Sequence, residues 1–345
     1  MTAFSGVVYS SGCEKHITAW EECLRSPSER VLVKNLHTSK GSWLASLLIV
    51  LLIGLSIRPE SAYGDQRTLT DAVGRQVTVP DSPKRIVSLA PDITETLFAL
   101  DLSEEIVGVT QFSDFPPPAA MKPKVGSYVD LNIEAIIDLN PDLILGTGAG
   151  TSPVLVKRLE RMEFSVFIVY PKDLDGVLEA IQQIADVVGR EWKGRAIVEN
   201  MRRRIDRVSH GVAGREKPRV FLQIGRDPIY TVSQGSFASH LIAIAGGDNI
   251  AKNAPIPYPS YSLEEIILQA PEVIIVTSMY IGGNQESWIE EWQKWGVLPA
   301  VKNNRLYTID SDIVDRPSPR IVDGLEKIAQ MIHPEVFPCE FSHEE

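Results

Sequence analysis

The chain has 345 residues, of which 44% are hydrophobic and 23% are charged, and its formal net charge is −11. This length is sufficient for two domains with sizeable cores, and the composition is that of a folded globular protein. The negative charge argues against a general nucleic-acid-binding protein, which needs a basic face, so we expect no nucleic-acid partner.

Residues 1–64 are predicted to be an N-terminal extension that contains a secretory signal peptide. Residues 41–57 carry no charge and follow several basic residues, and small residues precede a cleavage site after Gly64. Cleavage there would make Asp65 the first mature residue, and a true start site near Val31 is a further hypothesis. The alternative is a retained membrane anchor, since about 17 apolar residues is the lower limit for spanning a bilayer. The signal predicts a periplasmic protein.

The mature chain would contain one cysteine, Cys339, because Cys13 and Cys23 lie before the cleavage site. A single thiol provides neither a disulfide framework nor a metal cluster. The histidines of the mature chain are scattered along the sequence, which argues against a three-histidine metal site. We therefore expect no bound metal. No cysteine follows the apolar segment at lipoprotein spacing, which favours a soluble exported protein over a lipid-anchored one.

After a polar leader over residues 65–82, strands and helices alternate, which predicts an N-terminal α/β lobe over residues 83–172. The alternation indicates βαβ units and a mostly parallel sheet. The expected elements are strand 85–90, helix 93–100, strand 106–110, helix 132–139, strand 142–146, a helix that starts at 151–153, and strand 166–170.

Residues 173–212 are predicted to form a backbone helix that connects two lobes. Apolar residues recur at spacings of three and four from residue 177 to residue 208, which indicates one continuous helical stripe. A helix of roughly 35 residues would be about 50 Å long, a length better suited to crossing two lobes than to lying inside one. We expect a kink or break at residues 189–191.

A second α/β lobe is predicted over residues 218–335, so the predicted architecture is two lobes connected by one long helix. The expected elements are a strand from 219, helices 236–245 and 262–269, strand 272–277, a Trp-rich helix 288–295, strand 305–309 and helix 319–332.

Two segments that lie 130 residues apart, 128–145 and 258–275, share one pattern. Each has a tyrosine, a helix N-cap residue, a glutamate in the first helical turn, an apolar face, a proline and a buried strand. The glutamates are Glu134 and Glu264. Acidic residues are common in a first helical turn because the helix dipole favours them, which is the simple alternative for each one. As a matched pair on two lobes, they could instead bind two arginines of a two-fold symmetric partner.

Three aromatic residues are candidates for lining a cleft between the lobes. Tyr128 and Tyr258 lie just before the repeated helices, and Phe112 lies in a loop that follows a predicted strand. Loops at strand ends line the ligand site in open α/β sheets. Aromatic rings from both lobes would suit a large, flat, partly apolar ligand. The alternative is that each ring packs on its own lobe.

Charged residues follow the strand predicted at 305–309, in the sequence S-D-I-V-D-R-P-S-P-R. Asp312, Asp315 and Arg316 could bind amide and hydroxyl groups of a ligand, or they could be solvated surface residues. The glycines at 146, 148 and 150 do not have the spacing of a dinucleotide-binding loop, and the sequence G-x-S-x-G of hydrolases is absent. A nucleotide-dependent enzyme is therefore a distant alternative.

The chain resembles the periplasmic cobalamin-binding proteins of ABC importers, which belong to a class of solute receptors whose two lobes are joined by one backbone helix. The resemblance covers residues 83–335 and rests on R-I-V-S-L-A-P-D-I-T-E, V-G-V-T-Q-F-S-D-F-P-P, N-I-E-A-I-I-D-L-N-P-D-L-I-L, R-V-F-L-Q-I-G, G-G-D-N-I and S-D-I-V-D-R-P-S-P-R. The segments F-S-D-F-P-P and S-D-x-x-x-R-x-S-P-R are more particular to the cobalamin group. The others also occur in receptors for haem, siderophores and other chelates, which remain the alternative.

The resemblance implies capture of a corrinoid between the lobes and its delivery to a permease dimer that works with ATPase subunits. It implies a monomer that is not an enzyme and needs no cofactor, with cobalamin as transported ligand. Glu134 and Glu264 would dock on permease arginines. The chain departs from the pattern at Thr147, where an aromatic residue can occur, and at Ala245, where the family can carry a cysteine. The implied ligand-binding residues are Phe112, Tyr128, Thr147, Ile224, Tyr258, Asp312, Ile313, Val314, Asp315 and Arg316.

Overall fold

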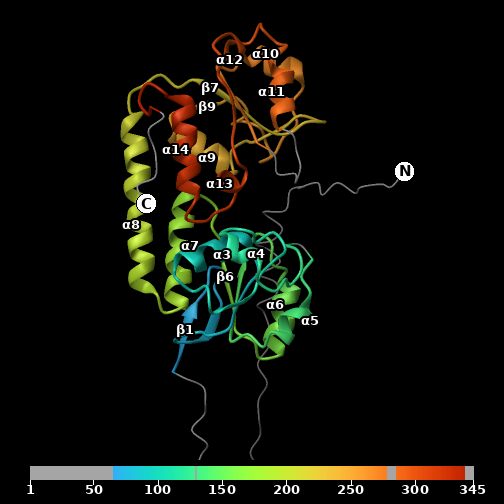
Figure 1. The fold of residues 1–345 in the computed structure, drawn as a ribbon, viewed down its shortest axis with the longest axis vertical. Coiled ribbons are helices and arrows are strands. Elements are labelled where there is room, and N and C mark those ends of the chain that lie inside the picture. The colour runs from blue at the N-terminus through green and yellow to red at the C-terminus, as the bar shows by residue number, and fades with distance from the viewer. Residues whose placement is uncertain (1–64, 129, 278–284, 339–345) are drawn as a thin grey trace, which may run out of the picture.

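The computed structural model describes residues 65–128, 130–277 and 285–338. The predicted signal segment 41–57 and Cys339 lie outside these residues. The described chain forms two α/β lobes that lie one above the other in Figure 1. Among the described helices, none has both the length and the apolar character that crossing a membrane requires.

The N-terminal lobe contains a parallel four-stranded sheet in the order β4-β3-β5-β6. Alternate residues of its central strand face opposite sides, as the pleat of a strand requires. Leu143 and Leu145 pack with α3 and with α7 (Leu174–Val187), and Ile144 packs with α5 and α6. The bounds are β3 Ile86–Ser88, α3 Pro91–Ala99, β4 Ile106–Gly108, α4 Pro117–Ala120, α5 Ile133–Asp138, β5 Leu143–Thr147, α6 Pro153–Arg161 and β6 Val166–Val169.

Residues 65–82, predicted to be a polar segment that precedes the N-terminal lobe, are part of that lobe. Residues 65–82 contain an antiparallel hairpin, β1 (Gln66–Thr70) and β2 (Gln76–Pro80), whose Val77 and Val79 are buried in the lobe core. At the turn, the buried carboxylate of Asp71 accepts hydrogen bonds from the backbone N–H groups of residues 73, 75 and 168. The segment is mainly polar, and the alternation of a half-buried strand is visible only at the two valines of β2, which explains why the hairpin was not predicted.

The connection between the lobes is a helical hairpin and not one long helix. Helix α7 (Leu174–Val187) ends before Gly189, whose φ of +69° reverses the chain, and α8 (Glu191–Gly211) packs back along α7. A Cβ atom on Gly194 would lie 2.3 Å from Cβ of Ala185, so the two helices approach closely there. The expected break at 189–191 is confirmed, but it is a reversal and not a kink.

Helix α8 runs beside both lobes, as Figure 1 shows. Its first turns contact the N-terminal lobe through ion pairs of Glu191 with Arg67 and of Lys193 with Asp101. Further along, Arg204 pairs with two acidic residues of α14 in the C-terminal lobe. With 21 residues, α8 is about 32 Å long and therefore shorter than the predicted helix of about 50 Å.

The C-terminal lobe contains a five-stranded sheet in the order β11-β10-β7-β8, with β9 also paired to β7. Strand β8 is antiparallel to β7, and the remaining pairs are parallel. The bounds are β7 Arg219–Gly225, β8 Tyr230–Thr231, α9 Phe237–Ile244, β9 Asp248–Asn249, α10 Leu263–Gln269, β10 Val273–Val276, α11 Gln285–Gln293, α12 Pro299–Lys302, β11 Leu306–Thr308, α13 Asp312–Asp315 and α14 Ile321–Ile332.

Candidate functional site

The predicted ligand residues of both lobes follow the carboxyl ends of parallel strands. Phe112 comes after β4, Thr147 ends β5, Ile224 lies at the end of β7, and α13 follows β11. Ligands of open α/β sheets bind at this edge. The segments after β4 and β11 contact each other, although they lie about 200 residues apart, and this contact joins the two lobes.

The contact is a cluster of charged and polar side chains that we call the interlobe clasp. It consists of Glu95 and Asp114 of the N-terminal lobe and of Arg316, Ser318 and Arg320 of the C-terminal lobe. Glu95 on α3 has a side chain only 2% exposed. Its carboxylate accepts hydrogen bonds from Arg316 Nη1 at 3.1 Å, from Ser318 Oγ at 2.5 Å, and from Arg320 Nε and Nη2 at 2.9 and 2.6 Å.

Arg316 is the most highly connected cation of the clasp. Its guanidinium group lies 3.1 Å from Glu95, 2.9 Å from Asp114 and 2.7 Å from Asp312. Burial opposes its charged form, but the hydrogen bond to Asp114 and the charge of Asp312 outweigh burial and raise the pKa of Arg316. Arg320 stacks on the ring of Phe115, with its central carbon 3.6 Å from the ring centre. The clasp thus joins cations of one lobe to carboxylates and an aromatic ring of the other.

Two carboxylic acids of α13 have perturbed pKa values. Burial raises the pKa of Asp312, and the neighbouring Arg316 partly offsets this effect. Burial also raises the pKa of Asp315 to about 7, with a further contribution from the charge of Asp312. Among the described residues, no donor reaches the buried Oδ2 atom of Asp315. Titratable groups with perturbed pKa values are typical of functional sites, although ion-pair networks produce them as well.

Four of the ten predicted ligand residues are buried in the lobes themselves. Ile313 and Val314 are 5% and 0% exposed, because the expected loop is the short helix α13, which packs these two residues into the C-terminal core. Ile224 belongs to the same core. Thr147 is buried at the end of β5, where its N–H group donates to Thr151 Oγ1. The side chains of Ile313 and Val314 anchor α13, and ligand contact by these four residues stays a prediction.

The remaining predicted residues keep exposed surface. Phe112 is 40% exposed, and Tyr128 and Tyr258 are half-buried, each against the core of its own lobe. The ring of Tyr128 lies directly over Gly150, since a Cβ atom there would be 2.1 Å from its Cζ atom. The glycine is therefore needed for the ring to occupy this position.

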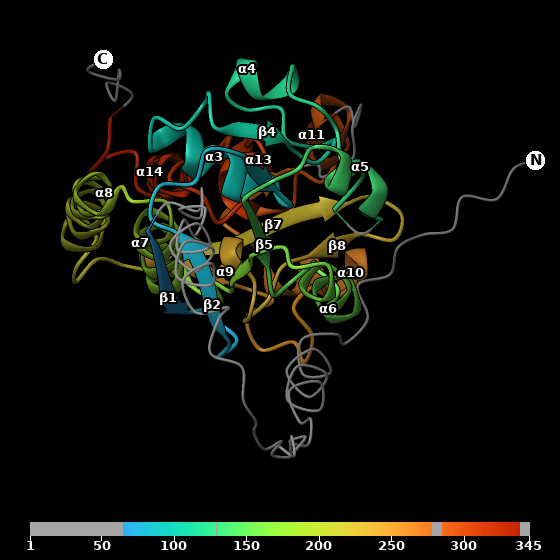
Figure 2. The same ribbon diagram turned by 90° about the horizontal axis from the view of Figure 1, so that it is seen from below.

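The repeated units place Glu134 and Glu264 at matching exposed positions of α5 and α10. The preceding residues cap both helices: the Asn132 side chain accepts from the N–H of residue 135, and the Ser262 side chain accepts from the N–H of residue 265. Both helices lie on the side of the molecule away from α8 (Figures 1 and 2). Glu134 pairs with Arg158 at 3.5 Å, and this pair is largely exposed.

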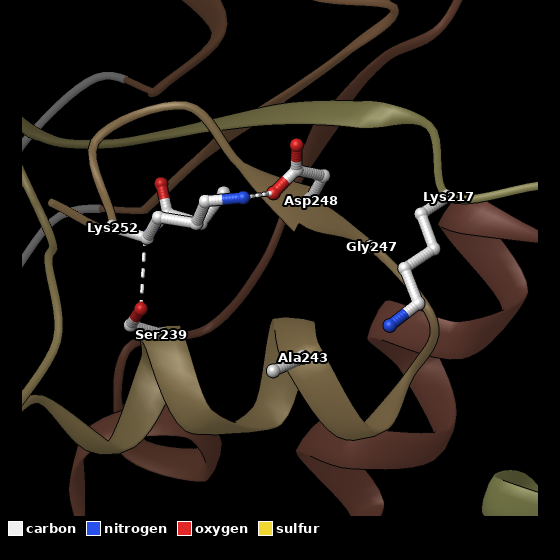
Figure 3. Close-up of a pocket in the computed structure, with 7 residues that line it drawn as sticks. Lys217, Ser239, Ala243, Gly247, Asp248 and Lys252 are labelled. Carbon is white, nitrogen blue, oxygen red and sulfur yellow. Dashed lines mark hydrogen bonds and ion pairs between the residues drawn. The ribbon is translucent and has the colours of Figure 1, made fainter.

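A pocket of about 310 Å³ lies elsewhere, in the C-terminal lobe (Figure 3). It borders β9, which pairs with the amino end of β7 and so lies at the opposite edge of the sheet from the candidate site. It contains none of the predicted ligand residues, and one of its lysines, Lys252, is paired with Asp248. Its lining residues are Lys217, Ser239, Ala243, Gly247, Asp248, Asn249 and Lys252.

Sequence reasoning did not identify Glu95, Asp114, Ser318 or Arg320 as site residues. The segments that contain these residues belong to the quoted motifs, but the sequence does not show that their side chains contact each other. The available indication was the position of Glu95 in the middle of the helix that follows β3, beyond the first turn where the helix dipole would favour an acidic residue. A buried charge of this kind needs a partner.

Comparisons with known proteins agree with this architecture. Curated relatives include the vitamin B12-binding protein of Vibrio cholerae serotype O1, which is 32% identical over 249 residues that cover 72% of this chain and 89% of the relative. An uncharacterized ABC transporter substrate-binding lipoprotein of Bacillus subtilis is 29% identical and covers 86% of this chain and 98% of the relative.

Solved structures give the same fold. The periplasmic vitamin B12-binding protein of Vibrio cholerae matches with a TM-score of 0.64 and 30% identity, over 73% of this chain and 97% of that chain. A periplasmic haem-binding protein from Roseiflexus sp. RS-1 matches with a TM-score of 0.65 and 26% identity, over 73% and 99%. The predicted fold class, α/β with two lobes and mostly parallel sheets, is confirmed, and the predicted single long backbone helix between the lobes is instead the hairpin of α7 and α8. The family model for the periplasmic binding proteins matches residues 86–313, and the chain belongs to this family.

Proposed function

We propose that this chain is the substrate-binding protein of an ABC importer and that its ligand is cobalamin or a related corrinoid. The similarity to vitamin B12-binding proteins, 32% in sequence over most of both chains, is the observation that carries this proposal. The segments particular to that group, around Phe112 and around Asp312–Arg316, meet at the carboxyl ends of β4 and β11, where a ligand of both lobes would bind.

The exposed residues at this edge suit a corrinoid, which is a large ring with amide side chains. Phe112, Tyr128 and Tyr258 would contact the ring, because aromatic side chains bury large apolar area against flat ligands. Asp312 and Arg316 would hydrogen-bond to the amides at its edge. Binding alone, without a catalytic step, accounts for all these residues.

Titration of purified protein comprising residues 65–345 tests the ligand class. Calorimetry with cyanocobalamin, cobinamide, haem and a ferric siderophore should give saturable heat with a corrinoid. Tryptophan fluorescence should be followed in parallel, to detect binding that produces little heat. Absence of binding to both corrinoids in both measurements would refute the proposal.

Variants test which residues hold the ligand. Phe112→Ala and Asp312→Asn should each weaken corrinoid binding while leaving the unfolding temperature nearly unchanged, because both side chains are partly exposed. Trp192→Ala is the matched control, since Trp192 is an aromatic residue 70% exposed at the start of α8. Equal affinities for Phe112→Ala, Asp312→Asn and the control would contradict the site.

A haem receptor is the second candidate, because a solved haem-binding protein matches at 26% identity with a TM-score of 0.65. None of the predicted ligand residues is a histidine, so the iron of a bound haem would need a tyrosine ligand such as Tyr128 or Tyr258. Tight binding of haem with no binding of a corrinoid would establish this candidate in place of the first.

For docking, we propose that Glu134 and Glu264 bind arginines on the two halves of a permease dimer. Both residues are exposed, and their helices, α5 and α10, lie on the side of the molecule away from α8, where one partner could reach both. Replacing both by alanine should abolish transport while the ligand affinity is retained. Glu199→Ala, an exposed residue of α8, is the control. Normal transport by the double variant would exclude the docking role.

We further propose that residues 1–64 direct export to the periplasm and are removed, leaving a monomer there. N-terminal sequencing of the exported protein should begin at Asp65. A mature protein that retains residues 41–57 would identify a membrane anchor instead.

A further inference from the structure

The interlobe clasp joins segments that the chain itself keeps far apart. Every side-chain hydrogen bond that the Glu95 carboxylate accepts from the described residues comes from a residue more than 220 positions later in the sequence. Within the described part of the chain, all of these donors belong to the C-terminal lobe. Glu95 therefore depends on the other lobe for its partners.

This dependence has a structural consequence. A carboxylate buried to 2% exposure is tolerated only when it is paired and hydrogen-bonded. If the lobes separated, Glu95 would lose four hydrogen bonds, and Arg316 and Arg320 would lose their shared partner. Such separation is therefore strongly disfavoured while the clasp is formed.

The clasp also fixes side chains of the candidate ligand site. Arg316, which Glu95 holds, pairs with Asp312 at 2.7 Å and with Asp114 at 2.9 Å. Asp114 lies two residues after Phe112, and its neighbour Phe115 stacks under Arg320. Glu95 itself is buried beneath these groups and makes its contacts with them. It acts on the site through Arg316 and not by direct contact with a ligand.

We propose that Glu95 is a positioning residue that locks the two lobes together and holds Arg316 for the ligand. The part that concerns the ligand rests on the proposed corrinoid-binding function, and the locking of the lobes does not. The contrasting explanation is that Glu95 only stabilises its own lobe, as a buried ion pair inside one lobe would.

The chain provides a matched control for that contrast. Asp71 and Arg75 form a buried ion pair at 2.5 Å within the N-terminal lobe, with side chains 0% and 6% exposed. Asp71→Asn removes a buried charge as Glu95→Gln does, but it leaves the contact between the lobes intact. A purely structural role predicts the same behaviour for both variants.

The distance between the lobes tests the lock without any ligand. In protein comprising residues 65–345, Cys339→Ser removes the one native thiol, and spin labels at Met162→Cys and Lys302→Cys then place one label on each lobe. Pulsed electron paramagnetic resonance should give a narrow distance distribution for otherwise unchanged protein and for Asp71→Asn. Glu95→Gln should give a broader distribution that extends to longer distances, and a distribution identical to that of the control would overturn the proposal.

If Glu95→Gln does not fold, a milder variant tests the same proposal. Arg320→Gln removes two of the four hydrogen bonds to Glu95 from the half-buried side of the clasp and leaves Arg316 and Ser318 in place. It should broaden the distribution to an intermediate extent. An unchanged distribution in Arg320→Gln would then overturn the lock.

Ligand affinity tests the positioning role through a double-mutant cycle. Glu95→Gln and Arg316→Gln should each weaken cyanocobalamin binding by about tenfold, and the double variant should bind about as weakly as Arg316→Gln alone, because coupled residues are not additive. Additive losses would overturn positioning through Arg316. If the unmodified protein binds no corrinoid, the proposed function fails, while the distance measurement still decides on the lock.

Discussion

The carboxyl group of Asp92 provides a quantitative test of the electrostatics at the lobe junction. Asp92 is the second residue of α3 and only 8% exposed, three positions before Glu95. Burial raises its pKa from 3.8 to about 7, and the charge of Glu95 adds to this effect. Hydrogen bonding to the backbone and the charge of Arg316 act in the opposite direction. The folded protein thus binds this proton more tightly than the unfolded chain does.

The sign and size of the effect follow from linkage. An acid with a raised folded-state pKa contributes its full stability below pH 3.8 and loses it as the pH rises through about 7. Each unit of difference between the folded and unfolded pKa values corresponds to 1.36 kcal/mol, so the free energy of unfolding falls by about 4 kcal/mol in total. Between pH 5 and pH 8 the loss from this group is about 2.5 kcal/mol, because at pH 5 part of it has already occurred.

Asp92→Asn removes the titrating group and keeps the shape of the side chain. Urea unfolding followed by tryptophan fluorescence should show that the variant gains about 2.5 kcal/mol of unfolding free energy relative to unchanged protein between pH 5 and pH 8. Asp175→Asn, at the matching second position of α7 but exposed, controls for loss of a carboxylate from a first helical turn. If the free energies of unfolding of Asp92→Asn and of the unchanged protein vary with pH in the same way over this range, burial does not raise the pKa of Asp92 as we infer.

Three further predictions concern other parts of the molecule. Gly150→Ala places a Cβ atom 2.1 Å from Tyr128 Cζ, so the ring must move. Calorimetry should then show weaker corrinoid binding, and the free energy of unfolding should fall by about 1 kcal/mol because the displaced ring is half-buried. Asp71→Asn removes the buried one of the two carboxylates that pair with Arg75, leaving only the more exposed Glu160, and should lower the unfolding free energy by about 3 kcal/mol in urea titrations. Arg158→Ala removes an exposed pair worth less than about 1 kcal/mol, so stability should be unchanged, while low-salt affinity for reconstituted permease should rise as Glu134 is uncovered.

Much of the fold could be predicted because local signals and tertiary packing agree. The helix expected at 132–139 occurs as α5 at Ile133–Asp138, since Asn132 caps its start and a proline follows its end. Strands β5 and β6 were identifiable as short apolar runs, as expected for a sheet that is covered on both faces. The reversal between α7 and α8 was only partly predictable. A glycine with positive φ permits a break, but apolar periodicity does not give the direction in which the chain continues.

The lobe junction was less predictable, for a physical reason. Helix and strand patterns repeat over two to four residues, whereas Glu95 and Arg316 are 221 positions apart and no local spacing connects them. The approach of these residues depends on how the two lobes are oriented, which the sequence pattern does not specify. The same limit explains Ile313 and Val314. Their position after a strand suggested a loop, whereas they lie in the short helix α13, whose packing against the core buries both side chains.

The clasp and α8 are two separate connections between the lobes, and their placement bears on ligand release. Helix α8 lies on one side of the molecule, and α5 and α10 lie on the other (Figures 1 and 2). Helix α3, which carries Glu95, and α13, which directly precedes Arg316, lie between them. A partner that held Glu134 and Glu264 would therefore act at the side farthest from α8. Force applied there would rotate the lobes about α8 and separate Glu95 from Arg316 and Arg320. Because the clasp holds Arg316 for the ligand, the same motion would open the lobes and withdraw a ligand contact, so we expect docking and release to be coupled through Glu95.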